Sequence, residues 1–281
     1  MRAELRSKYD RLLEVLREAD GVLVAYSGGV DSTLLLKAAT EALGARALAV
    51  TATSELYPQQ EVEEATRVAA SMGARRRIIE TDEMTREQFC ENPPERCYYC
   101  KQELFGRLRA IAEEEGLPIV ADGTNADDTS DYRPGMKAAR ELAVRSPLRE
   151  AGLSKSEIRE LSKEMGLPTW DKPSLACLAS RFPYGDRITP DKLEQVRAAE
   201  QALRDLGLRQ VRVRHYGQTA RIEVEEGVLP TLIDPKLRPR IIEEFHRLGY
   251  LYVTLDLEGY RTGSMNAPLG VDGTPAPDDS P

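Results

Sequence analysis

A glycine-rich hexapeptide between a strand-like and a helix-like segment constrains the fold of this chain more than any other feature. Ser27-Gly28-Gly29-Val30-Asp31-Ser32 follows the apolar run 21–26 and precedes the segment 33–43, whose apolar residues recur at helical spacing. Two glycines let the backbone approach an anion, and free N–H groups at the start of a helix point at it. We therefore predict a phosphate-binding loop, the alternative being a glycine turn that merely joins strand to helix.

The residues of this loop separate it from two better-known phosphate loops. It matches neither the G-x-x-x-x-G-K-[ST] pattern nor the dinucleotide pattern G-x-G-x-x-G. Ser27 and Ser32 add hydroxyl donors, whereas the negative charge of Asp31 would repel a phosphate. Asp31 therefore predicts that Mg²⁺ or a cationic partner lies beside the phosphate.

Strand-like and helix-like segments alternate through the first two thirds of the chain. Such alternation favours an α/β domain, over residues 1–185, in which helices cover both faces of a parallel sheet. The predicted strands after the first are 45–52, 75–82 and 117–123, and the predicted helices include 58–72, a helix running on from Cys97, and 154–165.

The alternation stops at a segment rich in Pro, Gly and Ser. Residues 170–188 predict a long ordered loop joining two domains, and long loops inside compact proteins are often functional. We expect a small α+β domain over 186–265 and a disordered tail over 266–281. The predicted elements of the small domain are helices near 190–205 and 236–248 and strands near 209–215, 219–225 and 250–257.

Charge and hydropathy exclude several classes of protein. Lys and Arg number 39 and Asp and Glu 47, which gives a net charge of −8, and the two signs are interleaved. A protein that grips a long nucleic acid usually carries a basic stripe, so extended RNA or DNA binding is disfavoured. No apolar run reaches the roughly 18 residues of a membrane span, and the charged start is unlike a signal peptide. We expect a cytoplasmic protein.

The cysteines predict metal or redox chemistry. Cys97 and Cys100 lie three residues apart at the start of a predicted helix, and Cys177 lies in the long loop. These three thiols suit a [4Fe–4S] cluster with one iron left open, although four cysteine ligands are more common. A thiol–disulfide relay, a zinc site and unremarkable thiols remain the alternatives, and zinc would need a fourth ligand that neither Cys90 nor a histidine supplies at suitable spacing.

The hexapeptide SGGVDS in this setting resembles the PP-loop of the ATP pyrophosphatase superfamily, whose fold is adenine nucleotide alpha hydrolase-like. The resemblance implies that ATP is cleaved between its α- and β-phosphates and that pyrophosphate leaves into the glycine loop. In such sheets the ligand lies at the carboxyl ends of the strands. Those ends supply the remaining candidates for ATP and Mg²⁺, set against ordinary loop chemistry as the alternative: Ala25, Thr53, Gly123, Asn125, Asp127 and Asp128.

Longer strings narrow the resemblance to one family. The strings ENPPERCYYCK, GTNADDTSDYRPG, LPTWDKPSLACLASRFPYG and VRVRHYGQTARIEV look like the LarE family of pyridinium-3,5-biscarboxylic acid mononucleotide sulfurtransferases, over about residues 5–260. The family makes the nickel-pincer nucleotide cofactor: it adenylylates a substrate carboxylate and replaces a carboxyl oxygen with sulfur. One branch sacrifices the sulfur of a cysteine, and the other uses three cysteines to hold a [4Fe–4S] cluster. The C-x-x-C pair places this sequence in the cluster branch.

The resemblance also implies roles for individual residues. Ser27, Gly28, Gly29, Asp31 and Ser32 are expected to hold the ATP phosphates and magnesium, while Cys97, Cys100 and Cys177 hold the cluster and supply the sulfur chemistry. Ser180 and Arg181 would orient the adenylylated carboxyl group. Arg212 and Arg214 alternate on one predicted strand and would bind the substrate phosphate, with Glu200 and Glu223 shaping that site or forming salt bridges. A homo-oligomer, such as a hexamer, is also implied.

Three other functions are alternatives to this one. A tRNA thiolation enzyme of the same superfamily fits the loop and the C-x-x-C pair, but the acidic composition counts against it. An amide-forming synthetase is disfavoured because it needs a supply of ammonia and because its reaction gives the three cysteines no function. A nucleotide sensor that holds ATP without cleaving it is the alternative from outside the enzymes.

Overall fold

The computed structural model describes residues 2–129, 134–173, 176–261 and 263–270. Its chain contacts divide it into two compact units, which are described separately below. The first comprises residues 1–85 and 95–175, and the second comprises 86–94 and 176–281. Compared with the expected domains, the second unit gains residues 86–94 and 176–185. Most of the expected disordered tail, residues 271–281, lies outside the described residues.

The first unit contains a four-stranded parallel sheet of order β3-β2-β1-β4. The chain runs from the central strand β1 outward to β2 and β3, and then crosses to β4 on the other side of β1. The carboxyl ends of β1 and β4 therefore flank the point where the strand order reverses, which is the usual ligand crevice of such sheets. The strands are β1 (Val22–Ala25), β2 (Ala47–Thr53), β3 (Arg75–Glu80) and β4 (Ile119–Ala121).

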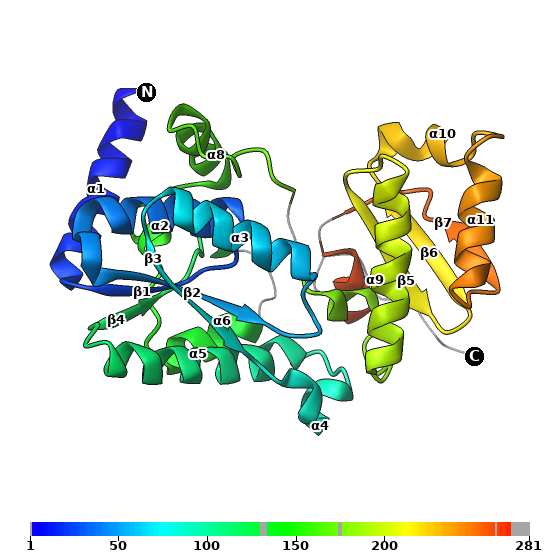
Figure 1. Ribbon diagram of the computed structural model, residues 1–281, viewed down its shortest axis with the longest axis horizontal. Coiled ribbons are helices and arrows are strands. Elements are labelled where there is room, and N and C mark those ends of the chain that lie inside the picture. Colours follow the sequence, from blue (N-terminus) through cyan, green and yellow to red (C-terminus); the bar gives the residue numbers. More distant parts are fainter. Residues whose placement is uncertain (1, 130–133, 174–175, 262, 271–281) are drawn as a thin grey trace. The chain divides into compact units, whose positions relative to one another are not determined.

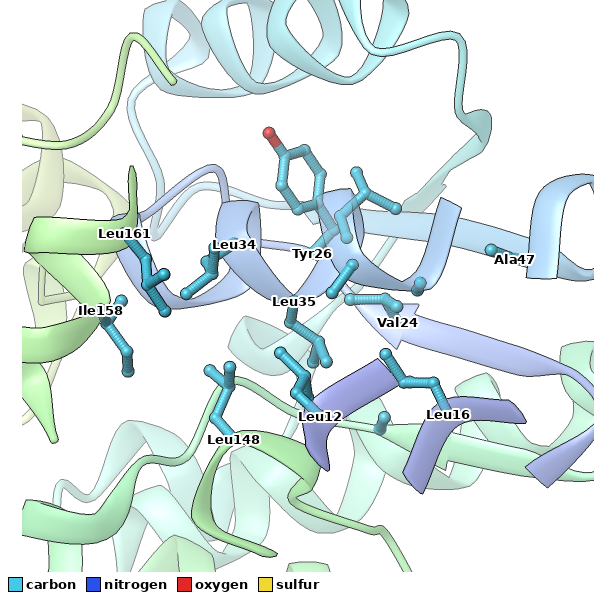
Figure 2. Packing of buried hydrophobic residues seen from close by; sticks show 14 of the residues in the cluster. Leu12, Leu16, Val24, Tyr26, Leu34, Leu35, Ala47, Leu148, Ile158 and Leu161 are labelled. Carbon is cyan, nitrogen blue, oxygen red and sulfur yellow. The ribbon is translucent and has the colours of Figure 1, made fainter. Parts of the chain in front are cut away.

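Helices cover both faces of this sheet, as the alternation of segments predicts, so the α/β class is confirmed (Figure 1). One face packs against α1 (Ala3–Ala19), α2 (Val30–Leu43), α3 (Gln59–Ser71), α7 (Pro147–Glu150) and α8 (Lys155–Glu164). The other face packs against α5 (Arg96–Glu114) and α6 (Pro134–Glu141). Figure 2 shows the first core, in which Leu35 and Val24 meet Leu12 and Leu16 of α1.

Local sequence signals set several helix boundaries. At the start of α8, the Ser154 hydroxyl accepts the N–H of Glu157 while the Glu157 carboxylate accepts the N–H of Ser154, which is a complete capping box. The short helices α6 and α7 were not predicted. Both begin at a proline, Pro134 and Pro147, which suits the first turn of a helix but also marks a turn in a sequence.

The second unit contains a three-stranded mixed sheet of order β5-β6-β7, as expected for a small α+β domain. One face of the sheet packs against α9 and α11 around Phe245, Tyr250 and Val213. The elements are α4 (Glu87–Cys90), α9 (Pro190–Asp205), β5 (Val211–Tyr216), β6 (Thr219–Val224), α10 (Leu229–Leu232), α11 (Arg238–Arg247) and β7 (Tyr252–Leu255), with short 3-10 turns at Leu178–Arg181 and Ser264–Leu269. Within the described ranges, we find no helix long and apolar enough to cross a membrane.

Candidate active site

The glycine loop joins β1 to α2 at the carboxyl edge of the sheet. The residue before the loop, Tyr26, is fixed because its N–H donates to the Val50 carbonyl at 2.9 Å. Gly28 has φ +70°, and a Cβ atom there would lie 2.6 Å from the Cβ atom of Ala65 on α3. Only glycine satisfies both the backbone conformation and the close approach of α3. Gly28 is therefore required by the shape of the loop.

The start of α2 leaves backbone donors for an anion. Gly29 is the N-cap residue and has no side chain that could accept the first N–H groups of the helix. The Ser27 and Ser32 hydroxyls lie 3.1 Å apart, and the Ser32 hydroxyl also contacts the Gly29 carbonyl at 3.3 Å. Backbone N–H groups and two hydroxyls thus gather at one helix N-terminus, which is the donor set that a phosphate group needs.

Asp31 is held by a cation and an amide from two other segments. The Lys155 ammonium, at the start of α8, forms an ion pair with the Asp31 carboxylate. The Asn125 amide donates to the other carboxylate oxygen at 3.3 Å. Sequence analysis predicted magnesium or a cationic partner beside Asp31, and Lys155 is such a partner. Lys155 itself was missed, since 124 positions separate it from Asp31.

The segment after β4 approaches the glycine loop closely. A Cβ atom on Gly123 would lie 3.1 Å from the backbone nitrogen of Ser32. Asn125 is buried, and its backbone N–H donates to the Asp128 carboxylate at 2.9 Å. The Asp127 carboxylate accepts the N–H of Lys155 at 2.8 Å. Both aspartates thus organise the loop, and magnesium binding by either stays a prediction.

Ala25 and Thr53 close the carboxyl ends of β1 and β2. Both are partly exposed, and they lie on neighbouring strands of the sheet. The Thr53 carbonyl accepts the N–H of Thr81 at 2.9 Å. Their expected role in holding ATP stays a prediction.

Cys97 and Cys100 lie one helical turn apart near the start of α5. Cys97 is exposed and Cys100 partly exposed. The Cys100 thiol lies 3.7 Å from the carboxylate of Glu83, which is buried and also accepts the Thr81 hydroxyl at 3.2 Å. By contrast, burial raises the pKa of the Cys90 thiol, which lies in the second unit. Cys90 therefore has the surroundings of a structural cysteine.

Cys177 begins a tight 3-10 turn in the second unit. Its carbonyl accepts the N–H of Ser180 at 3.0 Å, the Ser180 hydroxyl at 2.9 Å and the Arg181 guanidinium at 3.2 Å. Arg181, predicted to orient a reacting carboxyl group, is only 1% exposed, and it forms a two-point ion pair with Glu200. Cys177 is partly exposed, while the hydrogen bonds to its carbonyl fix its backbone.

Arg212 and Arg214 project from one face of β5, as their alternation predicts, and both are buried. Arg214 forms a two-point ion pair with Glu223, at 2.9 and 2.6 Å, and donates to the Ser180 carbonyl at 2.8 Å. The Arg212 guanidinium stacks over the Tyr260 ring. Glu200 and Glu223 thus both form salt bridges, one of the two roles expected of them.

The charges of this cluster shift one another's pKa values. Burial and the nearby Arg181 lower the pKa of Arg212 to about 10. Burial alone would raise the pKa of Glu200, but Arg181 and Arg212 hold it below its ordinary value. This arginine-rich cluster consists of the buried Arg181, Arg212, Arg214, Glu200 and Glu223, so three guanidinium groups face two carboxylates, an arrangement that favours an anion.

A groove of about 600 Å³ opens beside the cluster in the second unit. Its volume falls in the range of small-molecule sites. Ser264 lines the groove and its hydroxyl accepts from Arg214 at 3.0 Å, while Arg221, also on the wall, donates to Glu223 at 3.2 Å. The groove therefore borders the arginine cluster directly.

Three thiols are one ligand short of a closed zinc site, whereas a [4Fe–4S] cluster with three cysteine ligands leaves one iron open. Cys97 and Cys100 share one helix face, and Cys177 belongs to the other unit. Among the described residues, no group of three His, Cys, Asp or Glu side chains is gathered for a metal ion.

Two similarities to known protein families cover part of the chain, and the first includes the glycine loop. The sequence model of the NAD synthase family matches residues 8–114, which include β1, the glycine loop and α2. The B subunit of a GMP synthase from Methanococcus maripaludis is 31% identical over 173 residues, 55% of this chain and 54% of that protein.

Two relatives match over nearly their whole length. An uncharacterised protein of Synechocystis is 45% identical over 265 residues, 94% of this chain and 99% of that protein. The pyridinium-3,5-bisthiocarboxylic acid mononucleotide synthase of Lactiplantibacillus plantarum is 40% identical over 268 residues, 95% of this chain and 96% of the synthase. The chain therefore belongs to the family of this synthase, a family of ATP-dependent sulfurtransferases with a PP-loop.

Proposed function

We propose that this enzyme replaces a carboxyl oxygen of pyridinium-3,5-biscarboxylic acid mononucleotide with sulfur, as a step in nickel-pincer nucleotide synthesis. The observation that carries the proposal is the whole-length similarity to the L. plantarum synthase. The glycine loop and the arginine-rich cluster supply donor groups for the two phosphorylated substrates, ATP and the mononucleotide.

In the first half-reaction a substrate carboxylate oxygen attacks the α-phosphorus of ATP. The bond to the β-phosphate breaks, an acyl-adenylate forms, and pyrophosphate leaves into the glycine loop. The N–H groups at the start of α2 and the Ser27 and Ser32 hydroxyls stabilise the leaving group. Asp31 would hold Mg²⁺, and the Lys155 ammonium, which pairs with Asp31 in the structure, would then be free to contact the phosphates.

ATP lies along the carboxyl edge of the sheet, at the point where the strand order reverses. The adenosine portion contacts the ends of β1 and β2, at Ala25 and Thr53, and the segment after β4. In that segment Gly123 lets the chain approach Ser32 of the glycine loop, and Asn125 fixes the carboxylate of Asp31. Asp127 and Asp128 keep the segment in place and complete the surroundings of the magnesium ion.

In the second half-reaction a sulfur nucleophile attacks the acyl carbon and AMP leaves, which yields a thiocarboxylate. Cys97, Cys100 and Cys177 would hold a [4Fe–4S] cluster, which supplies a sulfur source other than a cysteine side chain. Ser180 and Arg181 fix the backbone beside Cys177. Direct donation of the Cys177 sulfur, with loss of the cysteine, is the competing chemistry.

The mononucleotide phosphate binds at the arginine-rich cluster of the second unit, reached from the adjoining groove. Arg212 and Arg214 supply the positive charge, while Glu223 orients the Arg214 guanidinium and Glu200 that of Arg181. Guanidinium groups suit a phosphate because they donate two parallel hydrogen bonds.

We also expect a homo-oligomer, which light scattering on the purified protein would detect.

Mass spectrometry of the reaction products tests this function. The anaerobically purified enzyme, Mg-ATP and the dicarboxylate mononucleotide should yield a product heavier by the difference between sulfur and oxygen. Release of pyrophosphate should require the mononucleotide. A pyrophosphate release that requires tRNA instead would favour a tRNA thiolation enzyme, and an unchanged mononucleotide mass would contradict the proposal.

A further inference from the structure

Glu200 has no exposed surface, and protein donors satisfy both oxygens of its carboxylate. One oxygen accepts from Arg181 Nε at 2.7 Å and from the backbone N–H of Val213 at 3.1 Å. The other accepts from Arg181 Nη2 at 3.0 Å and from Arg204 Nη2 at 2.8 Å. A carboxylate offers about four lone-pair sites, and four donors occupy them. Glu200 therefore has no free acceptor for a substrate.

Arg181 connects this carboxylate to the turn that carries Cys177. While Nε and Nη2 bind Glu200, Nη1 donates to the Ala176 carbonyl at 3.0 Å and to the Cys177 carbonyl at 3.2 Å. It also contacts the Ser180 hydroxyl at 2.9 Å, and that hydroxyl donates to the same Cys177 carbonyl at 2.9 Å. The guanidinium thus fixes the backbone on both sides of the cysteine.

The pair has the properties of a rigid support. An arginine fork and a carboxylate form two parallel bonds in one plane, so the pair allows little rotation. Arg181 is 1% exposed and Glu200 is fully buried, so water does not compete for these bonds. Val213 ties Glu200 to β5, and thus the turn is held to the sheet rather than to solvent-exposed groups.

We propose that Glu200 is a positioning residue for Cys177, acting through Arg181, and that it makes no contact with substrate. This inference rests on the proposed function, in which Cys177 takes part in sulfur transfer. Glu200 sets the direction in which the Cys177 side chain leaves the turn, and a reacting sulfur needs that direction to be fixed.

The experiment compares the purified wild-type protein with Glu200→Gln and with Arg204→Ala as a matched control. Glu200→Gln keeps the side-chain volume but removes the charge and replaces one of the two acceptor oxygens with an NH₂ donor. Arg204 contacts the same carboxylate from a partly exposed position and does not reach the turn in any contact described above. The readouts are hydrogen exchange of residues 176–182, single-turnover sulfur transfer, and the equilibrium affinity for the mononucleotide.

In Glu200→Gln we expect hydrogen exchange at residues 176–182 to become faster and sulfur transfer to become slower, each by about tenfold or more. This is the effect of losing one charge-assisted hydrogen bond. The affinity for the mononucleotide should stay within about twofold of wild type, and Arg204→Ala, which leaves the Arg181–Glu200 pair intact, should change exchange and sulfur transfer much less than Glu200→Gln does. Weaker mononucleotide binding with unchanged exchange would make Glu200 a substrate ligand and overturn the inference. Unchanged sulfur transfer would overturn it as well.

Two further outcomes are separated by design. If hydrogen exchange also becomes faster at residues 219–224 of β6, the Glu200→Gln variant has loosened the sheet. The double variant Arg181→Met/Glu200→Leu is then used instead, because removing both charges of a buried pair is often tolerated. The same local exchange and transfer results are then expected. If wild type transfers no sulfur, the proposed function fails, whereas the exchange and binding results still decide whether Glu200 supports the turn or contacts the substrate.

Discussion

Lys155 and Asp31 form an ion pair across 124 positions of sequence, so a cation from the start of α8 lies against the phosphate loop. Asn125 donates to the same carboxylate, from the segment after β4. Three elements therefore converge on one side chain at the point where the strand order reverses. This convergence makes Asp31 the residue whose replacement best separates catalysis from binding.

Asp31→Asn should lower the rate of pyrophosphate release by about a hundredfold or more while changing the affinity for ATP much less. Through Mg²⁺ the carboxylate would act on the negative charge that develops as pyrophosphate leaves, and such preorganised groups contribute about this factor. Asp191→Asn is the control, because Asp191 is exposed and also lies in the first turn of a helix. A rate equal to wild type would show that Asp31 does not act on magnesium.

Arg212→Met should weaken mononucleotide binding by about ten- to a hundredfold and leave the affinity for ATP unchanged. A charge-assisted contact of about 1.5–3 kcal/mol corresponds to this loss. Isothermal titration with each ligand separately measures both affinities. Arg209→Met, an exposed position before the same strand, is the control. Equal loss of ATP affinity would show that Arg212 does not act on the mononucleotide alone.

The stability of the second unit should fall as the pH is lowered below about 6.5, because of His215. Burial and the Lys192 charge lower the pKa of this histidine in the folded state. The unfolded chain therefore binds the proton first, near its ordinary pKa of about 6.5, and stability is lost until the folded pKa is reached. Urea midpoints between pH 7.5 and 5 measure the slope. His215→Gln should reduce it and His246→Gln, at the exposed second histidine, should not. Equal slopes in wild type and His215→Gln would contradict this origin.

Cys97→Ala should remove the iron, the brown colour and the sulfur transfer together, if three thiols hold the cluster. Cys90→Ala is the control, since Cys90 is buried in the second unit and outside the proposed ligand set. Iron analysis and a visible spectrum measure the first two effects. The intact wild-type mass should be unchanged after turnover. A protein lighter by H₂S, with dehydroalanine at position 177, would identify Cys177 as a sacrificial donor.

Short-range patterns predicted most of the first unit correctly. The apolar run 21–26 and the helical spacing after it correspond to β1 and α2, and Gly28 between them has φ +70°, a conformation that glycine adopts readily. These features depend on neighbouring residues, so the sequence displays them directly. The capping box of α8 is of the same kind.

Long-range contacts were harder to predict. The alternation on β5 places Arg212 and Arg214 on one face, but it does not show which side chains cover that face. In the structure that face is covered, because Ser180 and Ser264 accept from Arg214 and Tyr260 stacks on Arg212. Partners so far apart in sequence leave no periodic signal. The inclusion of residues 86–94 in the second unit was missed for the same reason.

The most direct test of the central claim is the path of a substrate oxygen. The mononucleotide is labelled with ¹⁸O in its carboxylates and incubated with the enzyme and Mg-ATP, and the nucleotide products are analysed by mass spectrometry. If a carboxylate attacks the α-phosphorus, each turnover should yield AMP carrying one ¹⁸O atom, together with unlabelled pyrophosphate. The account would be contradicted by unlabelled AMP, or by ADP with labelled orthophosphate.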